Sequence, residues 1–296
     1  MDESLAWTVY RPEEQEVKAA VFIIHGMEEH RRRYDAFANY LNSRGIGVVT
    51  YDLPGHGESA DKADRGYFGD DNGWRNLVIS ALDISLLTKN AFKNVPLIMM
   101  GHSIGTIIAR SYLQKYDRLI DGVILNGLPN YTPAAHAGKG IATFLGLVKG
   151  GKRHSKLLDR LVTGNFNSVI DDPRTPLDWL STNEKNVDAY IDDDDCGEPF
   201  TIRGYYDLFD GLVRMNDVQS YNCTKPDMPI YVVAGEDDPV IGGVKGFNES
   251  IRLLQSAGYK NIGRRLYPHM RHETLNETES RVVWDDIADY ILTFFC

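Results

Sequence analysis

The hydrophobic residues of this chain gather in short runs that alternate with amphipathic stretches. The runs at residues 19–24, 47–53, 95–100 and 122–126 are apolar and end at turn residues, which is typical of strands buried on both faces of a parallel sheet. Between the runs, residues 34–42, 74–91 and 104–114 carry apolar side chains at helical spacing. This alternation predicts an α/β domain with a mostly parallel sheet and helices on both of its faces.

The alternation stops at Leu128-Pro129 and does not resume until Pro229. The intervening chain is irregular, partly helical and rich in turn residues. Strands are predicted again at residues 229–234 and 263–267, with helices at 245–256 and 281–295. We therefore expect a split core, made of residues 1–127 and 226–296, that is interrupted by a mainly helical cap at residues 128–225.

The composition narrows the range of functions. Of the 296 residues, 43% are hydrophobic, which is enough for a large core and excludes a mainly disordered chain. The 42 acidic and 32 basic residues give a net charge of −10. Such a surface repels phosphate backbones, so we expect no nucleic-acid partner. The charge also opposes docking on an anionic membrane, although it does not oppose an apolar ligand.

The sequence favours a cytoplasmic protein without a transmembrane segment. No apolar run approaches the roughly 18 residues that a membrane span needs. The acidic start, Met1-Asp2-Glu3-Ser4, lacks the basic and apolar regions of a signal peptide. The three cysteines, Cys196, Cys223 and Cys296, are far apart and form neither a metal-binding spacing nor a disulfide framework.

A serine lies in the pattern G-x-S-x-G, at residues 101–105, between a predicted strand and a predicted helix. This context is typical of a nucleophile elbow, in which the sharp turn strains the serine backbone and leaves no room for side chains two residues away. The helix that follows would favour negative charge developing near Ser103. The alternative is a tight turn with an incidental serine, but the topology favours Ser103 as a nucleophile.

A serine hydroxyl needs a base, normally a histidine that a carboxylate orients, and in this fold the order along the chain is serine, acid, histidine. Three carboxylates follow the strand at 229–234, namely Glu236, Asp237 and Asp238. Asp238 is favoured because Pro239 fixes the turn directly after it. Beyond the last predicted strand, both His269 and His272 are in a position to act as the base.

Five motifs occur in order along the predicted core. They are His25-Gly26-Met27-Glu28-Glu29-His30 with Arg33-Tyr34, Asp52-Leu53-Pro54-Gly55-His56-Gly57-Glu58-Ser59, Gly101-His102-Ser103-Ile104-Gly105, Asp238-Pro239-Val240, and His272-Glu273 with Asn276-Glu277. In these motifs the chain resembles the monoacylglycerol lipase and lysophospholipase branch of the α/β-hydrolase superfamily. The resemblance implies an α/β-hydrolase fold in which Ser103 is the nucleophile, Asp238 the acid and His272 the base.

The oxyanion hole of such an enzyme is expected to consist of the backbone N–H groups of Met27 and Ile104. The chain departs from the family pattern at two positions where glycine is usual. Glu28 lies beside the oxyanion loop and is expected to contact substrate and to alter what the pocket admits. Thr106 follows the elbow and is expected to change only the packing of the helix against the sheet.

Further segments allow more than one interpretation. The apolar stretch at residues 141–148, which includes Phe144 and Leu145, could line an acyl pocket, touch a membrane surface or pack within the cap. We take Phe144, Leu145 and His102 as substrate-binding candidates. The acidic run at residues 192–195 lacks the closing glutamate of a calcium loop, so a solvated loop is favoured and no metal site is predicted.

The sequence thus predicts a serine ester hydrolase that forms an acyl-enzyme and needs no metal or organic cofactor. Monoacylglycerols, lysophospholipids or related small-molecule acyl esters are the expected substrates, and the oligomeric state is left open. An aminopeptidase-like amide hydrolase is the first alternative, and it would need a site for a free amino terminus, such as cap carboxylates facing Ser103. A ligand-binding homologue without catalysis is the second.

Overall fold

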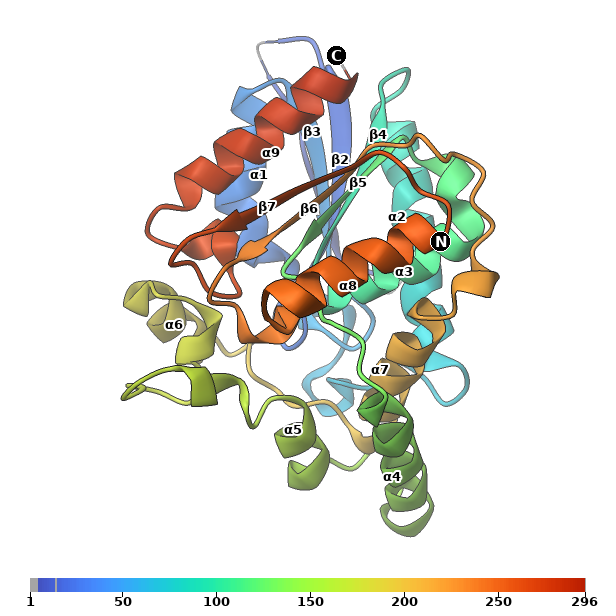
Figure 1. Cartoon of the computed structure of the whole chain (residues 1–296), viewed down its shortest axis with the longest axis vertical. Helices are drawn as coiled ribbons and strands as arrows, with labels where there is room; N and C mark the ends of the chain where they lie inside the picture. Colours follow the sequence, from blue (N-terminus) through green and yellow to red (C-terminus); the bar gives the residue numbers. More distant parts are fainter. Residues whose placement is uncertain (1–4, 14, 296) are drawn as a thin grey trace.

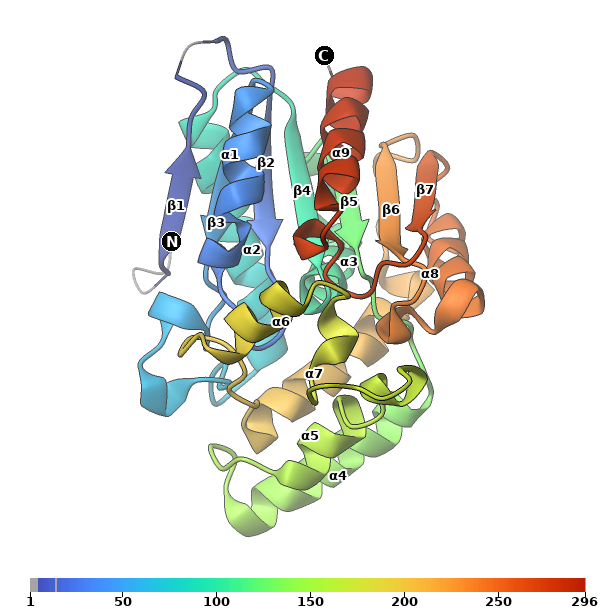
Figure 2. The ribbon, with the colours of Figure 1, turned by 90° about the vertical axis from the view of Figure 1, so that its left-hand side faces the viewer.

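The computed structural model describes residues 5–13 and 15–295. Within them, seven strands form one sheet in the order β1-β3-β2-β4-β5-β6-β7 (Figures 1 and 2). β1 is antiparallel to β3, and all other neighbouring strands are parallel. The strands are β1 (Trp7–Tyr10), β2 (Ala19–Ile24), β3 (Ile46–Tyr51), β4 (Leu97–His102), β5 (Gly122–Asn126), β6 (Ile230–Gly235) and β7 (Ile262–Tyr267). The predicted α/β fold with a mostly parallel sheet is confirmed.

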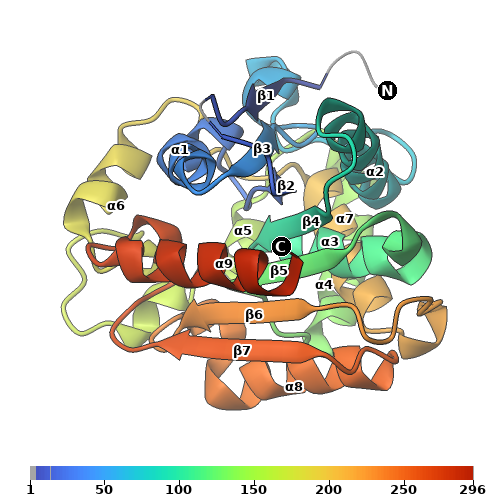
Figure 3. The ribbon, with the colours of Figure 1, turned by 90° about the horizontal axis from the view of Figure 1, so that it is seen from above.

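Helices cover both faces of the sheet, as Figure 3 shows from above. One face carries α1 (Asp35–Ser43) and α9 (Ser280–Phe295), and the other carries α2 (Gly73–Ala91), α3 (Ile104–Tyr116) and α8 (Gly243–Ser256). Successive strand residues point to opposite faces, so Phe22 of β2 joins the hydrophobic cluster under α2 and α3 while Val21 joins the one under α1. Both faces are apolar, which explains the continuous hydrophobic runs in the sequence.

The edge strand β1 was not predicted from the sequence. It has only four residues, and Trp7 at its start is 42% exposed, so it lacks the apolar run that marks a buried strand. Its position comes from pairing with β3, where Trp7 lies opposite Tyr51. A short, partly exposed strand of this kind is determined by its neighbour rather than by its own residues.

Four helices lie between β5 and β6 in the sequence and gather beyond the carboxyl ends of the parallel strands (Figure 2). They are α4 (Ala134–Lys149), α5 (Lys156–Val162), α6 (Glu184–Ile191) and α7 (Ile202–Met215). α7 connects this layer to the core, since Tyr205 and Phe209 are buried within the same hydrophobic cluster as α2 and α3. A Cβ on Gly138 of α4 would lie 2.6 Å from the Phe209 ring, so glycine allows α4 and α7 to pack closely.

Two features singled out in the sequence, the acidic start at Met1–Ser4 and the cysteine at position 296, lie outside the described residues. In the ranges 5–13 and 15–295, no helix is both long and apolar enough to cross a membrane. Cys196 and Cys223 are free thiols.

Candidate active site

Ser103 lies at the sharp turn between β4 and α3. Its backbone has φ 52° and ψ −120°, a region that residues with a side chain rarely adopt. A Cβ on Gly101 would lie 2.5 Å from the carbonyl oxygen of Gly105, and one on Gly105 would lie 2.2 Å from that of Ile24. Both glycines are therefore required by close backbone contacts, and the turn holds Ser103 at the carboxyl end of the sheet.

His272 and Asp238 form a hydrogen bond although they follow different strands, β7 and β6. His272 Nδ1 donates to Asp238 Oδ2 at 2.9 Å, and each residue is only 2% exposed. The second carboxylate oxygen, Oδ1, accepts the backbone N–H of Val240 at 2.8 Å. The carboxylate is thus fixed from two sides, and it determines that the Nδ1 atom of His272 carries the proton.

Burial of the His272 imidazole lowers its pKa, but the Asp238 carboxylate outweighs this effect and raises the pKa above the ordinary value of 6.5. Glu273 and Glu29 add to the increase. The indole ring of Trp179 packs against the imidazole at 5.3 Å between ring centroids. The imidazole is therefore shielded from solvent while its protonated form is stabilised.

The other acid and base candidates lie apart from this pair. Glu236 and Asp237 are exposed at the start of the loop after β6. His269 is also exposed, in a turn where its φ is +58°. The structure thus brings Asp238 and His272 together and leaves these three side chains at the surface.

A cavity of about 840 Å³ lies between the ends of the strands and the helices α4–α7. Ser103 and His272 both line it, as do Met27, Ile104 and His102. Within the described part of the chain, the backbone N–H groups of Met27 and Ile104 donate to no other residue. Two unpartnered donors therefore lie in the same cavity as the serine.

The remaining substrate-binding candidates divide into two groups. Glu28 and His102 line the cavity, whereas Phe144 and Leu145 do not. Phe144 is 64% exposed, and Ile141, one helical turn earlier in α4, lines the cavity in its place. α4 leads away from the strand ends (Figure 1), and every residue of α4 that lines the cavity belongs to the first half of the helix, at positions 134–141.

His102 is neutral in this site. Burial lowers its pKa to about 4, and the neighbouring His272, whose ring centroid is 4.7 Å away, lowers it as well. Its Nδ1 atom is buried without a hydrogen-bond partner in the described residues. His102 can thus offer a polar atom to a ligand without bringing a second positive charge next to His272.

Residues 15–279 match the family described as "Serine aminopeptidase, S33". The chain belongs to this family. It is 26% identical over 295 residues to a monoacylglycerol lipase of Mycolicibacterium smegmatis, an alignment that covers 98% of this chain and 93% of the relative. A monoglyceride lipase of Mus musculus is 24% identical over 271 residues, covering 90% of this chain and 80% of the relative.

Solved structures point to the same branch of the superfamily. A thermostable carboxyl esterase from Bacillus coagulans, crystallised with glycerol, superimposes with a TM-score of 0.90. It is 26% identical, and the match covers 98% of this chain and 94% of that one. This S33-family protein is therefore an α/β-hydrolase of the monoacylglycerol lipase-like branch.

Arg33 belongs to the first sequence motif of this α/β-hydrolase, but its function was not predicted from the sequence. Arg33 forms ion pairs with Glu29, which lies two residues after Met27, and with Glu273, which directly follows His272. Glu29 in turn accepts the hydroxyl of Tyr34 at 2.8 Å and the backbone N–H of Gly26. No local pattern indicates the contact with Glu273, because the two partners come from opposite ends of the chain.

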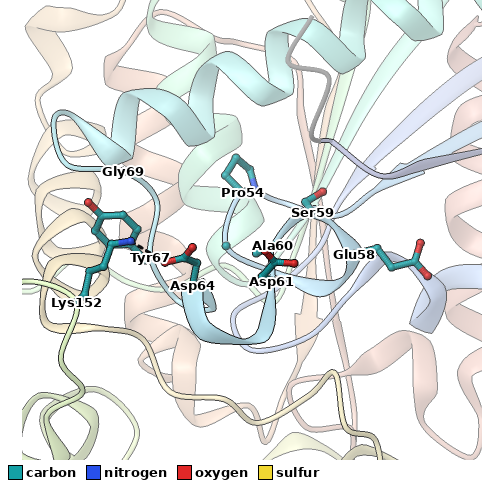
Figure 4. A pocket seen from close by; sticks show the side chains of 10 residues that line it. Pro54, Glu58, Ser59, Ala60, Asp61, Asp64, Tyr67, Gly69 and Lys152 are labelled. Carbon is teal, nitrogen blue, oxygen red and sulfur yellow. Dashed lines mark hydrogen bonds and ion pairs between the residues drawn. The ribbon is translucent and has the colours of Figure 1, made fainter.

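A second hollow of the S33-family protein lies beside the loop at residues 54–69 (Figure 4). Two of its charged groups satisfy each other, since Lys152 Nζ lies 2.7 Å from Asp64 Oδ1 and over the ring of Tyr67. Nearby, the buried Asp52 accepts the backbone N–H groups of Arg31 and Glu58. We interpret this region as a support for the loop rather than as a ligand site.

The acidic run at residues 192–195 is partly paired with the core. Asp195 forms an ion pair with Arg65, and Asp193 accepts His30 Nε2 at 2.9 Å. His30, Asp193 and Cys196 place one ligand atom each within 4.8 Å of one another. However, His30 Nδ1 accepts the backbone N–H of Arg32, so the proton is on Nε2 and that atom has no lone pair for a metal ion.

Proposed function

We propose that this α/β-hydrolase is a serine ester hydrolase acting on monoacylglycerols, lysophospholipids or related acyl esters, with Ser103, His272 and Asp238 as its catalytic residues. The observation that carries the proposal is the buried hydrogen bond between Asp238 and His272, a residue that lines the same cavity as the strained Ser103. The lipase and esterase relatives support ester chemistry.

In this mechanism His272 Nε2 removes the Ser103 proton as Oγ attacks the acyl carbonyl. The carbonyl π electrons move onto oxygen, and the backbone N–H groups of Met27 and Ile104 bind the oxyanion. Collapse of the tetrahedral intermediate expels the alcohol, which takes the proton from His272. Water then attacks the acyl-enzyme in the same way, releasing the acid and restoring Ser103 Oγ–H. Asp238 holds the imidazole tautomer throughout.

We further propose that residues 128–225 form a cap that selects the acyl group. Helices from this segment supply much of the apolar lining of the cavity, including Ile141, Leu161 and Leu208. An apolar wall opposite Ser103 favours an acyl chain over a polar group. With its ester carbonyl oxygen bound to the N–H groups of Met27 and Ile104 at the strand ends, the substrate would extend its acyl chain into the cap.

The cap also supports a transient contact with a lipid surface. Leu147 at the end of α4 is 83% exposed, and Phe144 and Val148 of the same helix and Leu161 of α5 are also exposed. Because the chain carries a net charge of −10, a zwitterionic surface is favoured over an anionic one. The free thiols of Cys196 and Cys223 support the cytoplasm as its compartment.

Amide hydrolysis is the second candidate, and one observation favours it. Asp159 of α5, in the proposed cap, lines the cavity that contains Ser103, as a site for a free amino terminus requires. The same catalytic residues can cleave amides. A panel of p-nitrophenyl esters of increasing chain length, compared with aminoacyl anilides, separates the two activities.

The decisive experiment is labelling with a fluorophosphonate probe combined with p-nitrophenyl ester hydrolysis. We expect the wild type to react with both, and Ser103→Ala to react with neither. Ser168→Ala is the matched control, because Ser168 is exposed and outside the cavity. Labelling that persists in Ser103→Ala would contradict the assignment of the nucleophile, and a wild type that binds esters without turnover would favour a binding protein.

A further inference from the structure

The Glu28 side chain is partly buried, and its carboxyl group has no partner among the described residues. It lines the cavity and directly follows Met27, one of the proposed oxyanion donors. Its Oε1 atom is buried without a hydrogen-bond partner, and the carboxyl group forms no hydrogen bond or ion pair within residues 5–13 and 15–295. A buried polar group of this kind is costly unless something satisfies it.

The backbone of Glu28 does not require a glutamate. Its φ is +57°, in the left-handed region that glycine adopts without strain and that costs other residues about 1 kcal/mol. Two hydrogen bonds hold it there, from the Tyr190 hydroxyl (2.7 Å) and the Gly197 N–H (2.9 Å) to the Glu28 carbonyl oxygen. The segment that contains α6 thus fixes the loop, and the Glu28 backbone is held in a strained conformation at the wall of the cavity that Ser103 also lines.

The surroundings of this carboxyl group are acidic. Burial, and then the charges of Asp159 and Glu198, raise the pKa of Glu28 to about 8. The hydroxyls of Tyr190 and Tyr205 also lie close enough to interact with it. Among the described residues that line the cavity there is no lysine and no arginine. No positively charged lysine or arginine among the described lining residues therefore offsets the acidic surroundings of Glu28.

We propose that Glu28, with Asp159, binds a cationic amine of the substrate, so that the preferred substrates are acyl esters carrying a protonated or quaternary ammonium group. The inference rests on the proposed function, because it takes the cavity to be the substrate site. The amine can belong to the alcohol part or to the acyl part of the ester. In both cases a cation beside Glu28 favours its ionised form, and the pair satisfies the buried carboxylate.

Glu28 is then a specificity-determining residue rather than part of the proton relay. A purely apolar cavity would bind a charged and a neutral isostere according to desolvation and would favour the neutral one. When Glu28 is ionised, the cavity instead favours the charged isostere over the neutral one. A hydroxyl-bearing head group would also hydrogen-bond to the carboxyl group, but it would not produce a preference for charge.

The test compares esters that differ only in charge. Butyrylcholine is paired with its neutral isostere, in which carbon replaces the quaternary nitrogen, and a second pair carries the same replacement at the end of the acyl chain of a p-nitrophenyl ester. For each pair the ratio of kcat/KM, cationic over neutral, is measured. The pair with the higher ratio shows whether the amine belongs to the alcohol or to the acyl part.

We expect the wild-type ratio to favour the cation and to fall about tenfold in Glu28→Gln, the change that follows from losing one charge-assisted contact. The matched control is Glu279→Gln, which removes the same charge from an exposed position outside the cavity and should leave the ratio within about twofold of the wild-type value. Asp159→Asn should lower the ratio by less than Glu28→Gln does.

A pH series on the wild type tests the same point without a variant. The quaternary ammonium does not titrate, so the ratio should rise between about pH 7 and pH 9 as Glu28 ionises. Titration of His272 affects both esters of a pair and cancels in the ratio. A ratio that is independent of pH and equal in wild type and Glu28→Gln would overturn the amine site alone, provided that the neutral ester is still hydrolysed through Ser103. Failure to hydrolyse every ester, with Ser103 unlabelled, would overturn the proposed function and this inference together.

Discussion

Arg33 and Glu273 are 240 residues apart in the sequence and form a two-pronged ion pair, with Arg33 Nη2 donating to Glu273 Oε2 at 2.8 Å. Arg33 Nη1 also lies 2.9 Å from Glu29, and all three side chains are buried. Glu29 belongs to the loop with Met27, and Glu273 directly follows His272. One guanidinium group thus holds the proposed oxyanion loop and the proposed base in a fixed relation.

Replacing this cation should damage both stability and catalysis. We expect Arg33→Met to lower the free energy of unfolding by about 3–5 kcal/mol, because two buried carboxylates lose their partner. Ester kcat/KM should fall at least about tenfold through misplacement of the loops. Urea unfolding and initial rates measure the two effects. Arg32→Met is the control, since Arg32 is 60% exposed and should change stability by less than about 1 kcal/mol.

The pH dependence of ester hydrolysis should reflect the raised pKa of His272. The base works in its neutral form, so kcat/KM should be lost as the pH falls through a midpoint above 6.5. In Arg33→Met the uncompensated Glu29 and Glu273 raise that pKa further, so the midpoint should move to higher pH. A midpoint that moves downward in the variant would contradict this arrangement of charges.

Removing the carboxylate beside His272 should be more severe. In Asp238→Asn the side-chain amide can donate to Nδ1, which favours the wrong tautomer of the imidazole, and we expect kcat to fall by about 10³–10⁴ by analogy with serine proteases. The exposed Asp237 provides the matched control, and Asp237→Asn should retain full activity. Comparable losses in the two variants would exclude Asp238 as the acid.

Glu28 should lower stability at alkaline pH. Its pKa is about 8 in the folded protein and about 4.5 when unfolded, so the unfolded chain ionises first and stability falls as the pH rises from about 4.5 to 8. The Glu28→Gln variant does not lose this stability, because glutamine does not ionise. The Tm difference between variant and wild type should be smallest near about pH 4 and should grow to its full value above about pH 8. Calorimetric scans across this range measure it.

The elbow should tolerate no side chain at Gly105. An alanine there would place its Cβ 2.2 Å from the Ile24 carbonyl oxygen. Because this oxygen is a backbone atom and no side chain can rotate away, the strand or the turn must move. We expect Gly105→Ala to cost about 3 kcal/mol and to abolish activity. Gly140→Ala in α4 has no atom within 4 Å of the new Cβ and should stabilise the protein by about 0.5–1 kcal/mol.

Much of the core followed from local patterns. The runs at residues 19–24 and 122–126 coincide with β2 and β5, since strands buried on both faces must be apolar at every position. The sharp turn at Ser103 was predicted because such a turn needs glycines at two fixed positions. β1 was missed because four half-exposed residues carry no such signal, and Phe144 was placed in the pocket because hydrophobicity alone does not show where a helix leads.

The sequence was sufficient for the order of the strands and helices, the position of the turn at Ser103 and the family, because each depends on residues close together in the chain. It left open whether His269 or His272 meets the acid until the family resemblance was considered. The hydrogen bond of His272 to Asp238, the Arg33 ion pairs and the unpaired carboxyl of Glu28 depend on contacts between distant segments. Local propensity does not encode such contacts, since they form only when the sheet and the helices α4–α7 pack together around one cavity.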